Sequence, residues 1–291
     1  MRKRVSRTQA THVRYRPRPM TDDLQAAVDE ISWYHTLELA PGVVTPGWFD
    51  TRQVAPQLPW PDLTGKRCLD VGTFDGFWAY EMEKRGAAEV VAVDALDPTV
   101  WDWPIGSHDE VVEAVGDRKR GGVGFELAHA ELGSKVVRHE LNIYDISEER
   151  LGRFDFIYLG SILLHLRDPI RALERVRSVC DGHVMSVDAI DLPLEFRMRG
   201  KPAAQLDGVG RPWWWKPNNA GLKRMVQDGG FDVVSGPTRV WMPMGGSVPR
   251  PIATPRKVLR KGGLEVLLTA LKGDPHAWIL AKPRDLGPQP A

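Results

Sequence analysis

"CLDVGTFDGF", residues 68 to 77, is the stretch of the 291-residue chain that decides its fold class. An apolar run ends here at Val71, and two glycines follow, Gly72 and Gly76. In a doubly wound α/β sheet, the turn after the first strand carries glycines, because a glycine lets the backbone approach a ligand closely. The stretch therefore predicts a buried strand, a ligand-binding turn and the start of a helix.

The chain on either side of this stretch alternates between strands and helices. Residues 67–71 and 89–94 are apolar runs, and residues 77–86 between them have a helical pattern that ends in a glycine. Apolar strands joined by a helix are typical of a parallel sheet covered on both faces. Further strands are predicted at 134–141, 154–160, 183–188, 231–236 and 276–282, with helices at 168–180 and 219–229. We therefore expect an α/β fold with a doubly wound, Rossmann-like, mostly parallel sheet of seven strands.

Three segments are predicted along the chain. Residues 1–20 form a basic flexible tail, since the first 18 residues contain arginines and lysines but no acid. Residues 21–64 form an N-terminal cap with one amphipathic helix at 21–32, and prolines keep 40–64 irregular. Residues 65–291 form the main domain, with C-terminal insertions at about 192–216 and 240–272.

Composition argues against several classes of protein. A formal net charge of +1 is unlike a globally basic nucleic-acid binder, although it allows a local basic patch. The two cysteines do not make a disulfide framework, and the eight histidines are too scattered for a metal site. No leader-like apolar segment and no run of about eighteen apolar residues occurs. We therefore expect a cytoplasmic protein with neither a membrane nor a metal partner.

The acids around the glycines indicate which ligand the turn binds. A dinucleotide-binding turn reads GxGxxG, whereas Gly72 and Gly76 are separated by three residues that include Asp75. A carboxylate there repels phosphate and attracts an amino or sulfonium group. Asp94 ends the second strand, where an acid accepts hydrogen bonds from both ribose hydroxyls. The combination predicts S-adenosylmethionine as the ligand.

Three longer segments resemble a known family. WYHTLELAPGVVTPG (33–47), DLTGKRCLDVG (62–72) and LGSILLHLRDPIRALERV (159–176) look like class I S-adenosylmethionine-dependent methyltransferases. Within that superfamily they resemble the bacterial wobble-uridine tRNA carboxymethyltransferases and their relatives. The resemblance covers about residues 30–235. Its first motif is shared by the whole superfamily, whereas LLHLRDP is more specific to the subgroup.

The resemblance implies a cofactor site that is contributed by four strand ends. It places the first turn at the methionine end of the cofactor, and the end of the second strand at the ribose. It places the end of the third strand at the adenine, and the end of the fourth near the sulfonium. In that order the residues are Asp70, Gly72, Thr73, Phe74, Asp75 and Gly76; Asp94 and Ala95; Asn142 and Ile143; Gly160 and Ser161.

Two departures from the subgroup concern the form of the cofactor. The resemblance implies that the tRNA enzymes use a cofactor with an added carboxylate, held by a lysine before the cap motif and by a tyrosine. Here the first region has no lysine, and Leu164 stands at the tyrosine position. A second carboxylate would lack its hydrogen-bond donors, so we expect the unmodified cofactor.

Two histidines are candidates for a catalytic base. Methyl transfer to a hydroxyl requires removal of a proton, and a histidine side chain ordinarily titrates near neutrality. His165 follows the fourth strand, and His35 lies in the cap. The alternative roles are structural: His165 holds the loop before the helix that begins at Asp168, and His35 packs against Trp33.

Tryptophans are the candidates for acceptor binding. The chain has eleven, and three of them are adjacent at 213–215. Alternate side chains of an extended segment share a face, so the outer two of these three lie on one side. The residues predicted to bind the acceptor are Trp33, Trp48, Trp213 and Trp215, with Trp101 and Trp103 completing an aromatic wall. The alternative is that most of the tryptophans pack in the core.

The resulting prediction is an S-adenosylmethionine-dependent methyltransferase that acts on an oxygen of a small-molecule acceptor. One alternative is a tRNA-modifying enzyme that uses the basic tail and the cluster RKVLRK at 256–261. A second alternative is a cofactor-binding accessory protein without catalysis. A nicotinamide-dependent dehydrogenase is disfavoured because GxGxxG is missing.

Overall fold

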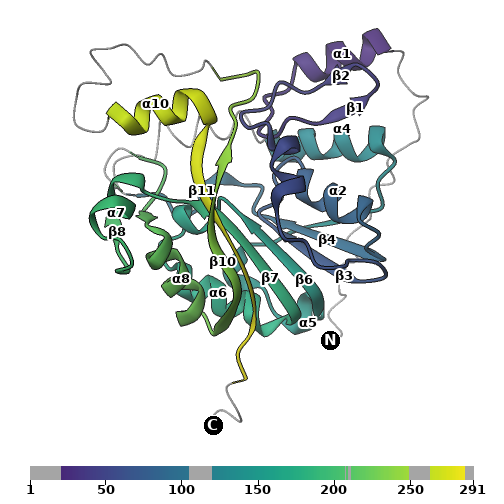
Figure 1. Ribbon diagram of the computed structural model, residues 1–291. Helices are drawn as coiled ribbons and strands as arrows, with labels where there is room; N and C mark the ends of the chain where they lie inside the picture. The colour runs from purple at the N-terminus through teal and green to yellow at the C-terminus, as the bar shows by residue number, and fades with distance from the viewer. Residues whose placement is uncertain (1–20, 105–119, 207, 209–210, 249–262, 286–291) are drawn as a thin grey trace, which may run out of the picture.

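The computed structural model describes residues 21–104, 120–206, 208, 211–248 and 263–285. Its centre is one sheet of seven strands (Figure 1). In chain order the strands are β3 (Arg67–Val71), β4 (Glu89–Asp94), β5 (Val137–Glu140), β6 (Phe154–Gly160), β7 (Cys180–Ala189), β10 (Phe231–Met242) and β11 (Asp274–Pro283). Across the sheet their order is β10-β11-β7-β6-β3-β4-β5.

The pairing of the strands confirms the predicted doubly wound topology. The strands from β3 to β7 pair in parallel, while β11 pairs antiparallel with both β7 and β10. The chain runs from β3 outward through β4 to β5, and then returns to β6 on the other side of β3. Ligands of such sheets bind beyond the carboxyl ends of the strands at this switch point. The topology therefore places a site beside β3 and β6.

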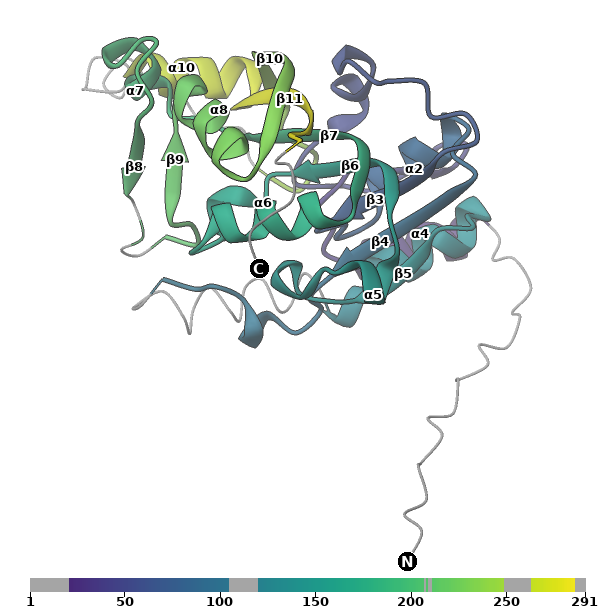
Figure 2. The same cartoon turned by 90° about the horizontal axis from the view of Figure 1, so that it is seen from below.

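Helices cover both faces of the sheet (Figures 1 and 2). Successive side chains of β3 point to opposite faces, so Cys68 packs in one hydrophobic cluster and Leu69 in the other. The first cluster includes side chains of α2 (Phe77–Lys84) and α4 (Val123–Leu132). The second includes side chains of α5 (Glu148–Leu151), α6 (Pro169–Ser178) and α8 (Asn219–Asp228). Burial on both faces explains why the central strands β3, β4 and β6 are largely apolar, whereas the edge strand β5 is mostly exposed.

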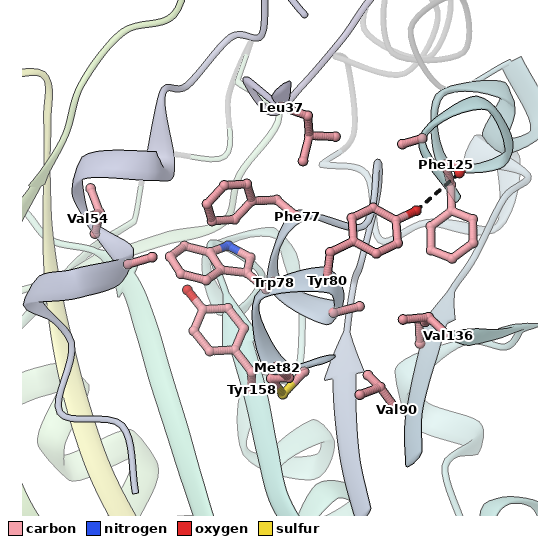
Figure 3. Close-up of a cluster of buried hydrophobic side chains, with 14 of the residues drawn as sticks. Leu37, Val54, Phe77, Trp78, Tyr80, Met82, Val90, Phe125, Val136 and Tyr158 are labelled. Carbon is pink, nitrogen blue, oxygen red and sulfur yellow. Dashed lines mark hydrogen bonds between the residues drawn. The ribbon is translucent and has the colours of Figure 1, made fainter. Parts of the chain in front are cut away.

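Aromatic rings form the core below the first turn (Figure 3). The rings of Trp78 in α2 and Tyr158 in β6 stack with their centroids 4.5 Å apart. The hydroxyl of Tyr80 donates to the carbonyl oxygen of Phe125 in α4 at 3.1 Å. These contacts join α2 to β6 on one side and to α4 on the other. They therefore fix the position of the turn between β3 and α2.

The N-terminal cap lies over the face that carries α2 and α4 (Figure 1). It consists of α1 (Thr21–Asp29) and a two-stranded sheet of β1 (Glu38–Ala40) and β2 (Val43–Val44). Helix α1 is shorter than the predicted 21–32, because the chain turns after it to place Trp33 in the core. The indole of Trp33 donates to the carbonyl oxygen of Val28 at 2.9 Å.

The segments after the sheet's fifth strand differ from the predicted ones mainly at their ends. Strand β10 continues beyond the predicted 231–236 because it pairs with β11 as far as Met242. The predicted insertion at 192–216 contains α7 (Leu192–Arg197) and the paired strands β8 (Ala204–Leu206) and β9 (Trp215–Pro217). Helix α10 (Gly263–Lys272) falls in the other predicted insertion.

Two predicted basic segments, the tail at 1–20 and the cluster at 256–261, lie outside the described residues. None of the helices in the described part of the chain is both long and apolar enough to cross a membrane.

Candidate functional site

A cavity opens at the carboxyl ends of β3, β4 and β6, where the strand order turns back. It contains about 1040 Å³ of space free of protein atoms, part of it open to solvent. Nine of the twelve predicted cofactor residues line the cavity, and Thr73, Asp75 and Gly76 do not.

The first turn has the backbone geometry of a close ligand contact. Gly72 has φ +77°, and a Cβ atom there would lie 2.8 Å from Cδ1 of Ile162. The backbone N–H of Phe74, a residue that itself has φ 51°, donates to Oδ2 of Asp94 at 2.8 Å. Asp94 therefore ties the turn after β3 to the end of β4. Its carboxylate lines the cavity where the ribose is predicted.

Asp75 does not face the cavity, which corrects the role that its place between two glycines suggested. Its Oδ2 atom accepts the backbone N–H groups of Tyr34 at 2.6 Å and of His35 at 2.9 Å. The side chain is buried, with 3% of its surface exposed. Asp75 therefore holds the cap to the turn, and it does not present a free carboxylate to a ligand.

Asp70 in β3 places a buried carboxylate at the cavity wall, next to the first turn. It lines the cavity, and its Oδ2 atom has no hydrogen-bond partner among the described residues. Burial raises the pKa of Asp70 to about 7. A cationic amino group beside it would favour the ionised form and offset the cost of burying the charge. Asp70 is therefore a buried carboxylate at the cavity wall whose charge suits the amino group of a methionine moiety.

The opposite end of the cavity is aromatic. The rings of Trp101 and Trp103 stack at 5.4 Å and line the cavity together with Asn142 and Ile143. The two indole N–H groups donate to backbone carbonyl oxygens of their own loop, which fixes the rings. Flat apolar surfaces of this kind suit a nucleobase.

The two predicted base candidates lie in different surroundings. His35 touches the cavity but is buried, and burial lowers its pKa to about 3, so its ring stays neutral at ordinary pH. A group that binds protons so weakly is a poor base near neutrality. His165 lines the cavity at 163–165, a 3₁₀ turn, and its Nδ1 lies 2.6 Å from the carbonyl oxygen of Pro212. Since a carbonyl only accepts, Nδ1 carries the proton and Nε2 is the basic nitrogen.

Most tryptophans predicted to bind the acceptor do not line the cavity. Trp33 is buried in the core at 1% exposure, and Trp48 lies outside the cavity wall. Trp215 donates its indole N–H to the carbonyl oxygen of Leu166, and Trp213 packs beside the ammonium of Lys216. The wall instead contains Trp78, Trp101 and Trp103. None of the four tryptophans predicted to bind the acceptor lines the cavity, whereas Trp101 and Trp103 of the predicted aromatic wall do.

Several cavity residues had no recognisable signal in the sequence. Tyr34 and Tyr144 line the cavity, and the Tyr144 hydroxyl donates to Asp102, which in turn accepts the backbone N–H of Arg167. His276, in the last strand, bonds to Ser161 across 115 residues of sequence. Tyr34 lies in the segment 33–47 that carries the family resemblance, but no local pattern marked it or the other residues as part of a site, and only the fold brings them together.

Comparisons with known proteins agree with this geometry. The family model described as "Methyltransferase domain" matches residues 48–236, more than half of the chain. A tRNA U34 carboxymethyltransferase of Campylobacter hominis is 28% identical over 120 residues, which cover 41% of this chain and 34% of that protein. A protein of the same name from Ectopseudomonas mendocina is 25% identical over 187 residues, covering 63% and 49%.

The chain thus spans about a third to a half of the length of these curated relatives. A solved structure of similar fold is the N-terminal domain of EvdMO1 with SAH bound, with a TM-score of 0.51 and 11% identity. That likeness covers 91% of this chain and 98% of the other. The family match spans the parallel strands of the sheet and most residues of the switch-point cavity, so the chain belongs to the methyltransferase domain family.

Proposed function

We propose that the protein transfers the methyl group of S-adenosylmethionine to an oxygen of a small, uncharged acceptor. The observation that carries this proposal is the chemistry of the cavity wall. Aromatic and apolar side chains predominate, and the charged groups are the carboxyls of Asp70, Asp94 and Asp102. No lysine or arginine is among the described residues that line it. A phosphate-rich acceptor needs cations at its contact surface, so this wall suits a small neutral molecule.

The cofactor is held by residues at four strand ends. Asp70 faces its amino group, Asp94 accepts hydrogen bonds from the ribose hydroxyls, and the Trp101 loop together with Ile143 flanks the adenine. Gly72 keeps the wall free of side chains at the turn. When bound, the cofactor supplies an electrophilic methyl group on a sulfonium. The protein's own part is to align an acceptor with that group and to take up the acceptor's proton.

The acceptor occupies the part of the cavity formed by Tyr34, Ser161 and His165. These polar side chains come from the cap and from the segment after β6. His165 directs its basic nitrogen, fixed by Pro212, to this region as either an acceptor contact or a base. Alignment by these groups accounts for much of the barrier reduction expected of a displacement reaction.

One observation weighs against a tRNA wobble uridine as the acceptor. Leu164, at the position where the tRNA enzymes carry a tyrosine, is buried with 7% exposure and brings no donor to the cavity. A carboxylate added to the cofactor would have to be buried without a partner on this side, which costs several kcal/mol by order of magnitude, roughly 2–7 for a polar group alone.

We expect the protein to purify with, or to bind, unmodified S-adenosylmethionine or its demethylated product. Mass spectrometry of the small molecules released from denatured protein measures this. An equimolar mixture of the ordinary and the carboxylated cofactor offered to the protein provides the control. Recovery of mainly the carboxylated form would contradict the proposal and favour tRNA modification.

The acceptor class is tested with labelled methyl groups. The full-length protein and radiolabelled S-adenosylmethionine are incubated with a panel of phenols and sugars, and in parallel with total bacterial tRNA. Label in a small hydroxyl compound at the oxygen, located by mass spectrometry, supports the proposal. Label in tRNA alone, with a rate that falls steeply as salt rises, would refute it.

A further inference from the structure

A chain of hydrogen bonds leads from the cavity wall into the sheet. The hydroxyl of Ser161 lies 2.9 Å from Nε2 of His276, which is buried in β11 with 2% exposure. Tyr34 and Ser161 line the cavity, whereas His276 lies behind them. The hydrogen bond therefore joins a hydroxyl at the cavity wall to a buried imidazole.

The contacts on the far side of the ring determine where its proton resides. Nδ1 of His276 lies 3.2 Å from the carbonyl oxygen of Asp274 and 3.5 Å from its carboxylate oxygen Oδ2. Both oxygens are acceptors, so Nδ1 carries the hydrogen. Nε2 is then unprotonated and accepts the hydroxyl proton of Ser161. The Ser161 hydroxyl therefore donates away from the cavity, toward His276.

Ser161 is held in a strained conformation that aims it at His276. It is one of two residues other than glycine with positive φ among the described residues, at 51°. Such a conformation costs of order 1–3 kcal/mol and persists only where the surroundings enforce it. Here Asp188 of β7 enforces it, since its Oδ2 atom accepts the backbone N–H groups of Ile162 at 3.1 Å and Leu163 at 2.8 Å. The strain is stored where the acceptor meets the protein.

We propose that His276, reached through the hydroxyl of Ser161, is the group that takes up the proton of the acceptor. This inference rests on the proposed transfer to oxygen. The acceptor's hydroxyl proton passes to Oγ of Ser161, while the proton of Ser161 passes to Nε2 of His276. The acceptor oxygen keeps the electron pair of its O–H bond and uses it to bond the methyl carbon. The electron pair of the former methyl–sulfur bond stays on sulfur, so the product is a neutral thioether beside a protonated imidazole.

The groups around His276 leave its ring neutral at ordinary pH, but unlike His35 it has a carboxylate, that of Asp274, 3.5 Å from Nδ1 to stabilise the protonated form. On β11 the carboxylate of Asp274 favours the protonated ring, and Lys216 from β9 opposes it. From β7 and the cap, Asp188 and Tyr34 face the same network, and β10 places Val240 opposite in the sheet. Burial outweighs these charges and lowers the pKa of His276 below its ordinary value. Because the neutral ring is the active form and its pKa is lowered, turnover should stay constant through neutral pH and decline only below the ordinary titration range of histidine.

His276→Gln is the variant that tests the relay. Its amide can still hydrogen-bond to Ser161 but cannot take up a proton. The assay uses a hydroxyl acceptor identified by the labelling experiment and saturating cofactor. We expect turnover to fall by about 10²- to 10⁴-fold, the usual contribution of a general base. The cofactor Kd should stay within about twofold of the wild type, since the ring lies behind the cavity wall. His183→Gln, a partly exposed histidine near the start of β7, is the matched control and should remain fully active.

Two further readouts separate a proton relay from a merely structural contact. An analogue of the acceptor whose hydroxyl is already ionised at the assay pH should be methylated almost equally by the wild type and by His276→Gln. Ser161→Ala should also lower turnover, and the double variant should be no worse than the more damaged single one, because residues that act as a unit are not additive.

A measurement without turnover examines the same arrangement. In the free wild-type protein with ¹⁵N-labelled histidine, the NMR spectrum should show His276 protonated on Nδ1 only. Ser161→Ala should shift the Nε2 signal. Protonation on Nε2, equal damage with the ionised acceptor, or full activity of His276→Gln would overturn the relay. The base would instead be His165 if His165→Gln abolished the fall of turnover at low pH while His276→Gln kept the activity and the pH profile of the wild type. If the wild type methylates no hydroxyl compound, the proposed function itself fails. The hydrogen bond between Ser161 and His276 seen in the spectrum is then a structural contact, and the relay is refuted with the function.

Discussion

Asp75→Ala is expected to lower the free energy of unfolding by about 2–6 kcal/mol, since two buried N–H groups lose their partner at about 1–3 kcal/mol each. The N–H groups are those of Tyr34 and His35, and the carboxylate that accepts them is 3% exposed. A Cβ atom on Gly124 in α4 would lie 2.7 Å from Oδ1, so the carboxylate is enclosed on its other side as well. Nothing nearby has room to replace it.

Denaturant unfolding measures the loss, and limited proteolysis locates it. The cap, residues 21–64, should become cleavable before the sheet, because Asp75 joins the cap to the turn. Asp75→Asn is the matched variant: its amide oxygen still accepts both N–H groups, so it should retain more than half of the lost stability. An unfolding free energy of Asp75→Ala within about 0.5 kcal/mol of the wild type, the usual effect of a neutral surface change, would show that the cap is held by other contacts.

Asp94→Ala is expected to weaken the binding of S-adenosylmethionine by roughly 1.5–3 kcal/mol or more, which is tenfold to over a hundredfold in Kd. Two effects act together. The ribose hydroxyls lose a charged acceptor, and the backbone N–H of Phe74 loses the carboxylate that fixes the turn at 2.8 Å. The ribose contact and the turn lie at the same wall of the cavity. The variant therefore loses a ligand contact and the backbone conformation of the wall together.

Titration calorimetry with the demethylated product measures this affinity without turnover. Asp94→Asn keeps an oxygen for Phe74 but loses the charge, so it should fall between the wild type and Asp94→Ala. Glu89→Ala changes an exposed acid at the other end of β4, where it pairs with Arg67, and should bind the cofactor as the wild type does. Equal Kd values for the wild type and Asp94→Ala would remove Asp94 from the cofactor site.

The acids of the site illustrate why a sequence pattern predicts the position of a residue in the fold better than it predicts the contacts of its side chain. Asp94 ends a buried strand next to the first turn, and both features follow from an apolar run and its boundary. Asp75 also lies between two glycines, yet its partners are backbone groups 40 and 41 residues away. No local pattern encodes the direction of a side chain toward such a distant segment, because that direction depends on where the cap packs.

The sequence by itself determined the strand, turn and helix at 67–84, the parallel strands of the sheet and the cofactor class. Apolar runs, glycines and helix caps act over a few residues, so they can be recognised without the fold. Tertiary structure alone decided that Trp33 is buried in the core and not in the cavity wall, and that His276 lies behind Ser161. These contacts join residues up to 115 positions apart, and they exist only because β11 inserts beside β7 and sets its side chains against the end of β6.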